Sequence, residues 1–136
     1  MTAGYSATPL AKKLSLKDGM RVWWDGMPAP VRREIEAEGL ALERLARAEA
    51  PIDAAHIFVV SRSEMEAKVA ALRPLLAGAG FIWVSWPKRA SKVPTDMSED
   101  AIRAAVLPGG ELVDVKVCAV DTTWSGLKLM IRKHRR

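Results

Sequence analysis

The hydrophobic positions of this chain alternate between strand-like and helix-like segments. Apolar runs of strand length lie at 20–24, 55–60 and 81–86, and segments with apolar residues at helical spacing lie at 28–39, 63–76 and 98–107. The run 81–86 is apolar on both faces, as central strands of parallel sheets are. The alternation predicts a small doubly wound α/β domain, with a mostly parallel sheet and helices on both of its faces.

Two more strands are predicted at the end of the chain, at 112–121 and 124–133. Valines alternate with polar residues in the first, and leucine and isoleucine alternate with Lys128, Met130 and Arg132 in the second. Strict alternation is typical of strands with one covered face and one wetter face. The pattern therefore predicts a C-terminal antiparallel β-hairpin at the edge of the sheet.

Local signals mark several boundaries. Thr8 followed by proline predicts the cap of a short first helix, a box from Ser63 to Glu66 predicts another helix start, and Ser98 predicts a third. The two glycines in 77–80 predict a turn before the strand at 81–86. Residues 40–45 are ambiguous: their composition favours a helix, whereas the glycine before them favours a new edge strand, which we prefer.

Composition agrees with one soluble globular domain, since 49% of the 136 residues are hydrophobic and 27% are charged. We expect a leader at 1–7, a single α/β domain at 8–132 and a basic tail at 133–136. The single cysteine, Cys118, excludes an internal disulfide and fits a reducing compartment. Because no long apolar run or signal-like start is present, we expect a cytoplasmic protein that makes no membrane contact.

The net charge of +5 is only weak evidence for a nucleic-acid partner, because most of it lies at one end of the sequence. Four of these charges lie in residues 132–136, which leaves +1 for residues 1–131. We therefore interpret the tail as a solvated segment and keep a phosphate-binding arm as the alternative.

The order of elements resembles the class I S-adenosylmethionine-dependent methyltransferase fold. Shorter phrases resemble a bacterial domain family of unknown function, regarded as methyltransferase-like and shortened. They are TPLAKKL (8–14), KDGMRV (17–22), WVSWPK (83–88), VPTD (93–96), VDVKVCAVD (113–121) and WSGLK (124–128). The resemblance spans most of 8–132 and implies this fold without an established activity.

The turn after the first strand departs from what the resemblance implies. Working methyltransferases place an acid and a glycine-rich loop there, whereas 25–30 has one glycine and two prolines. In such enzymes an acid ending the second strand holds the cofactor ribose, and Glu43 is the nearest candidate here. We therefore expect no cofactor, with S-adenosylmethionine bound weakly or not at all.

The best candidate site is the edge where the parallel strands end, because ligands of open α/β sheets bind there. The loop 86–96 leaves the central strand with three positive charges and two hydroxyl side chains, which suits an anion. Trp86 ends the central strand and Trp124 begins a hairpin strand, so either could line a pocket or stack on a partner. The candidate ligand-binding residues are Asp25, Gly26, Ser61, Arg62, Trp86, Lys88, Lys92 and Trp124.

No catalytic or metal-binding motif is present, and we interpret His56 and Cys118 as structural residues. The leading hypothesis is a methyltransferase-like domain, without catalysis, that binds a small anionic molecule or a protein at this edge. One alternative is an active methyltransferase that uses Asp25 and Gly26. The other is a nucleic-acid-associated protein that uses the basic loop and the tail.

Overall fold

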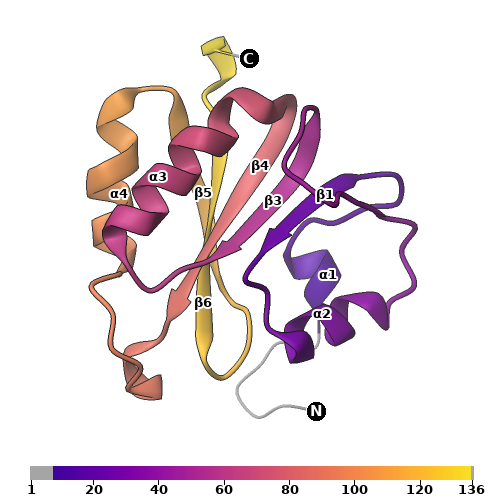
Figure 1. Cartoon of the computed structure of the whole chain (residues 1–136), viewed down its shortest axis with the longest axis horizontal. Coiled ribbons are helices and arrows are strands. Elements are labelled where there is room, and N and C mark those ends of the chain that lie inside the picture. Colours follow the sequence, from indigo (N-terminus) through magenta and orange to yellow (C-terminus); the bar gives the residue numbers. More distant parts are fainter. Residues whose placement is uncertain (1–7, 136) are drawn as a thin grey trace.

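The computed structural model describes residues 8–135, so the expected leader at 1–7 and Arg136 lie outside the described residues. Six strands form one sheet in the order β2-β1-β3-β4-β6-β5 (Figure 1). Strands β2, β1, β3 and β4 are parallel, and β6 runs antiparallel to both β4 and β5. Their bounds are β1 Arg21–Asp25, β2 Glu43–Arg44, β3 Ile52–Phe58, β4 Leu76–Pro87, β5 Leu112–Ala119 and β6 Trp124–Ile131.

This sheet confirms the expected parallel core and the C-terminal hairpin. It also places β1, β3 and β4 side by side, so their carboxyl ends share one edge. Segment 40–45 contains the two-residue strand β2, paired with β1 at the opposite border of the sheet from the hairpin, in agreement with the preferred edge-strand interpretation.

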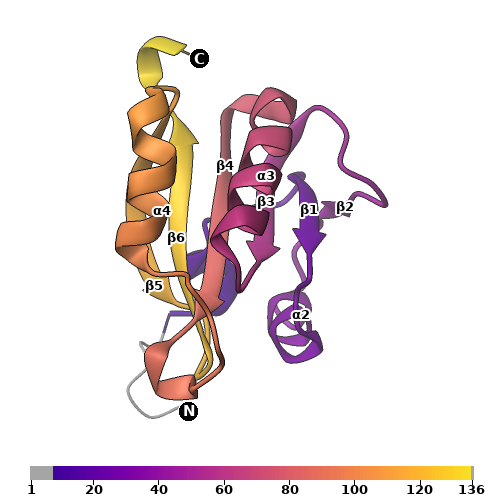
Figure 2. The ribbon, with the colours of Figure 1, turned by 60° about the vertical axis from the view of Figure 1, so that its left-hand side comes forward.

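Within residues 8–135, four α-helices cover the sheet, two on each face (Figures 1 and 2). They are α1 Leu10–Lys13, α2 Ala29–Glu36, α3 Arg62–Leu72 and α4 Glu99–Val106. Short 3-10 turns lie at Arg73–Leu75, Arg89–Ser91, Leu107–Gly109 and Lys133–Arg135. No helix within 8–135 is long and apolar enough to cross a membrane.

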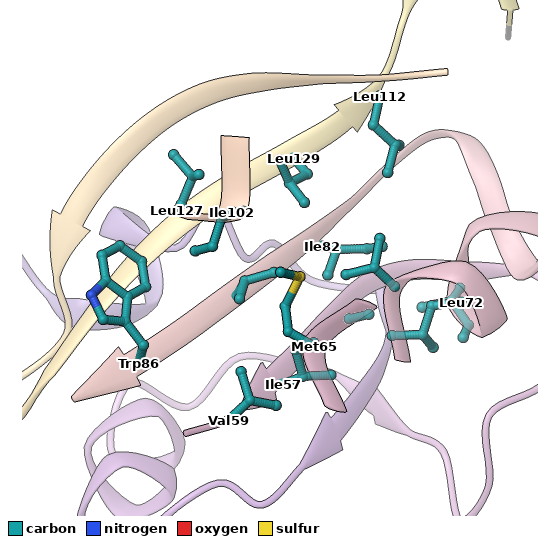
Figure 3. Close-up of a cluster of buried hydrophobic side chains, with 14 of the residues drawn as sticks. Ile57, Val59, Met65, Leu72, Ile82, Trp86, Ile102, Leu112, Leu127 and Leu129 are labelled. Carbon is teal, nitrogen blue, oxygen red and sulfur yellow. The ribbon is translucent and has the colours of Figure 1, made fainter. Parts of the chain in front are cut away.

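The core beneath α3 and α4 is mostly aliphatic, with Trp86 at one end. Met65 of α3 and Ile102 of α4 are fully buried against Ile82 of β4 and Leu129 of β6 (Figure 3). Both helices can bury one face against the sheet, because their apolar residues recur at helical spacing. This layer fixes the position of α4, whose first turn borders the candidate site.

The core beneath α1 and α2 contains polar groups as well as apolar ones. Trp83 is 1% exposed, and its Nε1 donates a hydrogen bond of 2.9 Å to the carbonyl oxygen of Leu14. His56 is 3% exposed, and its Nε2 lies 2.7 Å from Oγ of Ser85, which is itself fully buried. His56 therefore has a structural partner, as expected from the sequence.

The glycine segment 77–80 is strand, and the expectation of a turn there is wrong. Strand β4 begins at Leu76, directly after a 3-10 turn, and its pairing with β3 shifts register between Ile52 and Ala54. A Cβ at Gly80 would lie 2.7 Å from the carbonyl oxygen of Ile52. Glycine is required because β3 approaches the β4 backbone too closely for a side chain.

The hairpin does not follow the simple alternation that we expected. Val115 and Val117 of β5 are 46% and 43% exposed, whereas Lys128 of β6 is only 9% exposed. The pairing register shifts between Asp114 and Lys116, and such an irregularity changes which side chains face the core. No pattern in the sequence predicts this register shift.

Two helix starts also differ from expectation. The cap position of α1 is Pro9 rather than Thr8, without a side-chain hydrogen bond. Helix α3 is capped by Ser61, not Ser63, because the Ser61 hydroxyl accepts the N–H of Glu64. The sequence offers Ser-x-x-Glu twice in succession here, and the earlier copy is the one used.

Candidate ligand-binding site

A pocket of about 500 Å³ opens beneath the loop that follows β4. Its volume is within the range of small-molecule sites, about 300–1,000 Å³. Trp86 and Met97 are buried apolar residues of its lining, while Arg89 and Lys92 add two cationic side chains. The other lining residues are Pro87, Val93, Pro94, Thr95, Ser98 and Glu99.

Helix α4 begins at this pocket. The Ser98 hydroxyl accepts the N–H of Ala101 at 3.0 Å, which satisfies one donor of the first turn. Glu99 is ion-paired with Arg103, so its charge is balanced within the helix. The partial positive charge of a helix N-terminus adds to that of Arg89 and Lys92. The pocket thus combines the buried Trp86 with the cationic side chains of Arg89 and Lys92.

The loop is fastened to the start of α3. Thr95 donates its hydroxyl to the carbonyl oxygen of Val60 at 2.6 Å and accepts the N–H of Met97. The Asp96 carboxylate accepts the N–H of Arg62 at 2.7 Å. Lys92 has a left-handed backbone with φ of 61°. This conformation is uncommon for a residue other than glycine.

Of the residues proposed from the sequence, Trp86 and Lys92 line the pocket. Lys88 lies at the same strand end but outside the pocket lining, and its N–H donates to the carbonyl oxygen of Thr123. Our expectation of a Lys88–Lys92 pair is replaced by the pair Arg89 and Lys92.

Ser61 and Arg62 lie at the edge but serve the fold there. The Ser61 hydroxyl is used as the helix cap, and the Arg62 backbone holds the loop through Asp96. The Arg62 side chain is exposed. These two residues therefore border the site through backbone and capping contacts.

Trp124 lies on the other face of the sheet from Trp86. Trp124 pairs with Pro87 while Trp86 pairs with Ser125, and successive side chains of a strand point to opposite faces. Trp124 packs edge-on against Phe58, with ring centroids 5.1 Å apart, in the layer of α1 and α2. The two tryptophans do not form one pocket.

Asp25 and Gly26 end β1, two strands away from the pocket. Asp25 forms an ion pair of 2.9 Å with Lys68 of α3. Burial lowers the pKa of Lys68, but hydrogen bonds and charges from Asp25 and Glu64 outweigh it, so the pKa is raised. Sequence reasoning missed Lys68, although it lies four residues after Glu64, a spacing at which helical side chains meet.

Sequence reasoning left out Met97 and Ser98 as pocket residues, and Thr95 entered only as one of the hydroxyl side chains of the loop. Ser98 was predicted as the cap of α4, and the structure confirms that cap. The place of these residues in the pocket follows from the path of the loop, which turns back toward the start of α3.

A second pocket of about 330 Å³ lies at the opposite edge, between the ends of α3 and α4. Arg73 lines it and pairs with Glu111 at 3.3 Å, and its buried Nε has no hydrogen-bond partner among the described residues. Since ligands of open α/β sheets bind at the carboxyl ends of the strands, the loop pocket is the better candidate site. Residues 8–135 contain no cluster of His, Cys, Asp or Glu suited to a metal ion.

No protein-family model and no curated protein matches the sequence. Solved structures do match in fold. A SAM-dependent methyltransferase from Aquifex aeolicus has a TM-score of 0.58 and 17% identity, covering 90% of this chain and 88% of that one. Aeropyrum pernix fibrillarin with natively bound S-adenosyl-L-methionine has a TM-score of 0.53 and 14% identity, covering 89% and 73%.

A third similar structure is the magnesium protoporphyrin IX methyltransferase of Synechocystis with bound SAM, with a TM-score of 0.55 and 11% identity, covering 90% of this chain and 74% of that one. The fold of this chain is therefore methyltransferase-like: a small Rossmann-like α/β sheet with a C-terminal antiparallel hairpin.

These comparisons contradict our expectation of no cofactor. Two of the similar structures hold S-adenosylmethionine, which points to this compound as the cofactor that goes with the fold. The error came from treating the glycine-poor turn as decisive.

The turn after β1 leaves little space for a side chain at Gly26. This glycine is exposed at the edge with φ of +73°, and a Cβ there would lie 3.2 Å from the carbonyl oxygen of Phe58, at the end of β3. Glu43 does not fit the ribose role, because it pairs with Arg21 at the start of β1, away from the carboxyl edge.

Proposed function

We propose that this chain is a methyltransferase-like domain that binds S-adenosylmethionine beside Asp25 and Gly26 and an anionic group in the loop pocket. The observation that carries the proposal is one sheet edge with a bare glycine turn at β1 and a cationic, aromatic pocket at β4. Arg89 and Lys92 would bind a phosphate or carboxylate through charge-assisted hydrogen bonds.

We further propose that the domain binds without catalysing a reaction. A general base must lie within hydrogen-bond reach of the proton that it removes. The carboxylates named at this edge already have structural partners, which supports a structural role for them: Asp25 with Lys68, Asp96 with the N–H of Arg62, and Glu99 with Arg103. An active methyltransferase is the second candidate, favoured by the S-adenosylmethionine bound in similar structures.

A protein is the second kind of partner that this edge suits. Val60 and Val93 are 41% and 40% exposed beside the loop, which provides apolar contact area. We also propose that residues 8–132 act as one domain with a basic tail after them, and that the protein is cytoplasmic, which its single cysteine supports. Membership of the shortened bacterial family remains a proposal, supported by the phrases of residues 8–128.

The cofactor site is tested by calorimetry with S-adenosylmethionine and with its demethylated product. We expect a one-site isotherm for the wild type and at least tenfold weaker binding for Gly26→Ala, because a Cβ at Gly26 disturbs the turn. Gly39→Ala is the matched control, since Gly39 has φ of +70° but open space around it. Equal weakening in both variants, or no binding by the wild type, would contradict the cofactor site.

The anion site is tested with inorganic phosphate and adenosine monophosphate as probes. We expect the double variant Arg89→Gln/Lys92→Gln to lose affinity by about tenfold or more for each side chain, since a charge-assisted hydrogen bond contributes about 1.5–3 kcal/mol. Stability should hardly change, because exposed charges contribute little to folding.

The control for the anion site is Lys133→Gln/Arg135→Gln, which removes the same charge from an exposed turn away from the pocket. The anion site is refuted if the control weakens binding as much as the pocket variant does. Incubation with methyl-labelled S-adenosylmethionine and candidate acceptors separates the two functions, because label transfer would favour the active enzyme.

A further inference from the structure

Two lysines face each other on the hairpin, on the side of the sheet where α1 lies. Lys116 of β5 and Lys128 of β6 are directly opposite in the pairing register. The Lys128 amino group lies 4.4 Å from the ring centroid of Phe81, and that of Lys116 lies 5.9 Å from the ring centroid of Trp83. Both rings belong to the core layer beneath α1, so both amino groups lie on the face of the sheet that α1 covers. Like charges placed opposite each other destabilise a strand pair.

Lys128 is held in this position although its side chain is almost buried. Its Nζ donates to the Ser15 hydroxyl at 3.0 Å. Burial lowers the pKa of Lys128, and the nearby charges of Lys116 and Lys17 lower it further. Within residues 8–135, no carboxylate forms an ion pair with any of these three lysines. The positive charge is thus concentrated and unbalanced.

The positive field continues along β5. Burial raises the pKa of the Cys118 thiol, and the charges of Lys13, Lys116 and Lys88 partly offset that rise. Cys118 follows Lys116 by two residues and so lies on the same side of the strand. The charges of Lys13, Lys116 and Lys88 therefore act on Cys118, on the same side of the hairpin as Lys128.

We infer that this surface, which we call the lysine face (Lys17, Lys116 and Lys128), binds the phosphate backbone of a nucleic acid through the exposed Lys17 and Lys116, while the nearly buried Lys128 adds positive charge. A nucleic-acid strand carries one charge about every 3.4 Å, so it matches a row of amino groups better than a single anion does. Protein interfaces are depleted in lysine and depend on aromatic or arginine anchors, whereas nucleic-acid interfaces are strongly basic. The lysine face lies across the sheet from the loop pocket and is distinct from the tail.

The test is fluorescence anisotropy with a labelled 20-nucleotide RNA of mixed sequence, measured from 50 to 200 mM salt. We expect the wild type to bind at low salt and the logarithm of its affinity to fall linearly with the logarithm of salt. In Lys17→Gln/Lys116→Gln the slope should fall by about 2, one for each lost phosphate contact. Both side chains are exposed, so the fold should be kept, and thermal melting checks this.

Two controls carry the same loss of charge: Lys133→Gln/Arg135→Gln in the terminal turn and Arg89→Gln/Lys92→Gln at the pocket. We expect both to keep the wild-type slope, and a polyglutamate competitor to displace the RNA poorly. The inference is overturned if the wild type does not bind, if either control flattens the slope as much as the lysine-face variant, or if polyglutamate competes as well as unlabelled RNA.

Discussion

Acidification should unfold this protein mainly through His56. The imidazole is 3% exposed, lies 2.7 Å from the Ser85 hydroxyl and stacks on Phe58 with ring centroids 4.3 Å apart. Burial lowers the pKa of His56 to about 3. A charged imidazole in this layer would lack both water and a carboxylate partner, so the folded protein keeps the ring neutral.

The direction of the pH effect follows from this depressed pKa. In the unfolded chain His56 binds a proton near pH 6.5, whereas in the folded protein it resists protonation until about pH 3. The unfolded state therefore binds more protons in this window. The free energy of unfolding is fully retained above about pH 6.5 and decreases toward pH 3, by on the order of 5 kcal/mol in total.

The measurement is urea unfolding at a series of pH values for the wild type and His56→Gln. Glutamine can keep a hydrogen bond to Ser85 but does not titrate, so its stability should depend less on pH below 6.5. Carboxylates such as Asp114, whose pKa Arg103 lowers by a hydrogen bond, contribute equally to both proteins. His134→Gln, at an exposed position, should follow the wild type. Parallel curves for wild type and His56→Gln would refute this explanation.

Replacing Trp83 should produce the largest loss of stability among single core substitutions of the α1 layer. Trp83→Ala leaves a large cavity in the fully buried centre of β4, and such changes cost about 3–5 kcal/mol. The indole also donates to the carbonyl oxygen of Leu14, which follows α1. Loss of this bond leaves a buried acceptor unpaired, which costs about 1–3 kcal/mol.

Trp83→Phe removes the donor but keeps most of the buried side-chain volume, so its loss of stability comes mostly from the hydrogen bond. We expect Trp83→Phe to lose less stability than Trp83→Ala, and both to loosen α1. Trp23 of β1, which is half-buried on the other face of the sheet, provides the control Trp23→Ala. Chemical unfolding and amide exchange of residues 11–16 measure both effects. If the amides of α1 exchange as slowly in Trp83→Phe as in the wild type, the indole does not hold the helix.

The strands, the parallel core and the C-terminal hairpin could be predicted because the burial of a segment is reflected in the pattern of its hydrophobic residues. A segment such as 81–86, apolar on both faces, needs helices above and below it, which nearly defines the fold class. Pairing details leave no such trace. The register shift at Lys116 and the close approach at Gly80 depend on the partner strand, so the exposed valines of β5 and the strand character of 77–80 were missed.

The candidate site was predicted in part for a similar reason. Parallel strands bring their carboxyl ends to one edge, which correctly grouped Asp25, Arg62 and Trp86 along that edge. Which face a side chain takes depends on the register between β4 and β6, so Trp124 was wrongly placed with Trp86. The hydrogen bond from Thr95 to Val60 depends on the path of the loop in the folded protein, and no local sequence pattern predicts that path.

The fastening of the loop to the start of α3 has a consequence for exchange kinetics. The hydrogen bonds of Thr95 to Val60 and of Asp96 to Arg62 tie the pocket wall to the neighbouring strand–helix connection. When residues 95–96 move away from the start of α3, the pocket opens and the Arg62 amide is exposed to solvent at the same moment. Hydrogen–deuterium exchange at that single amide reports the opening frequency of the pocket, and occupancy of the pocket slows it without any probe on the ligand.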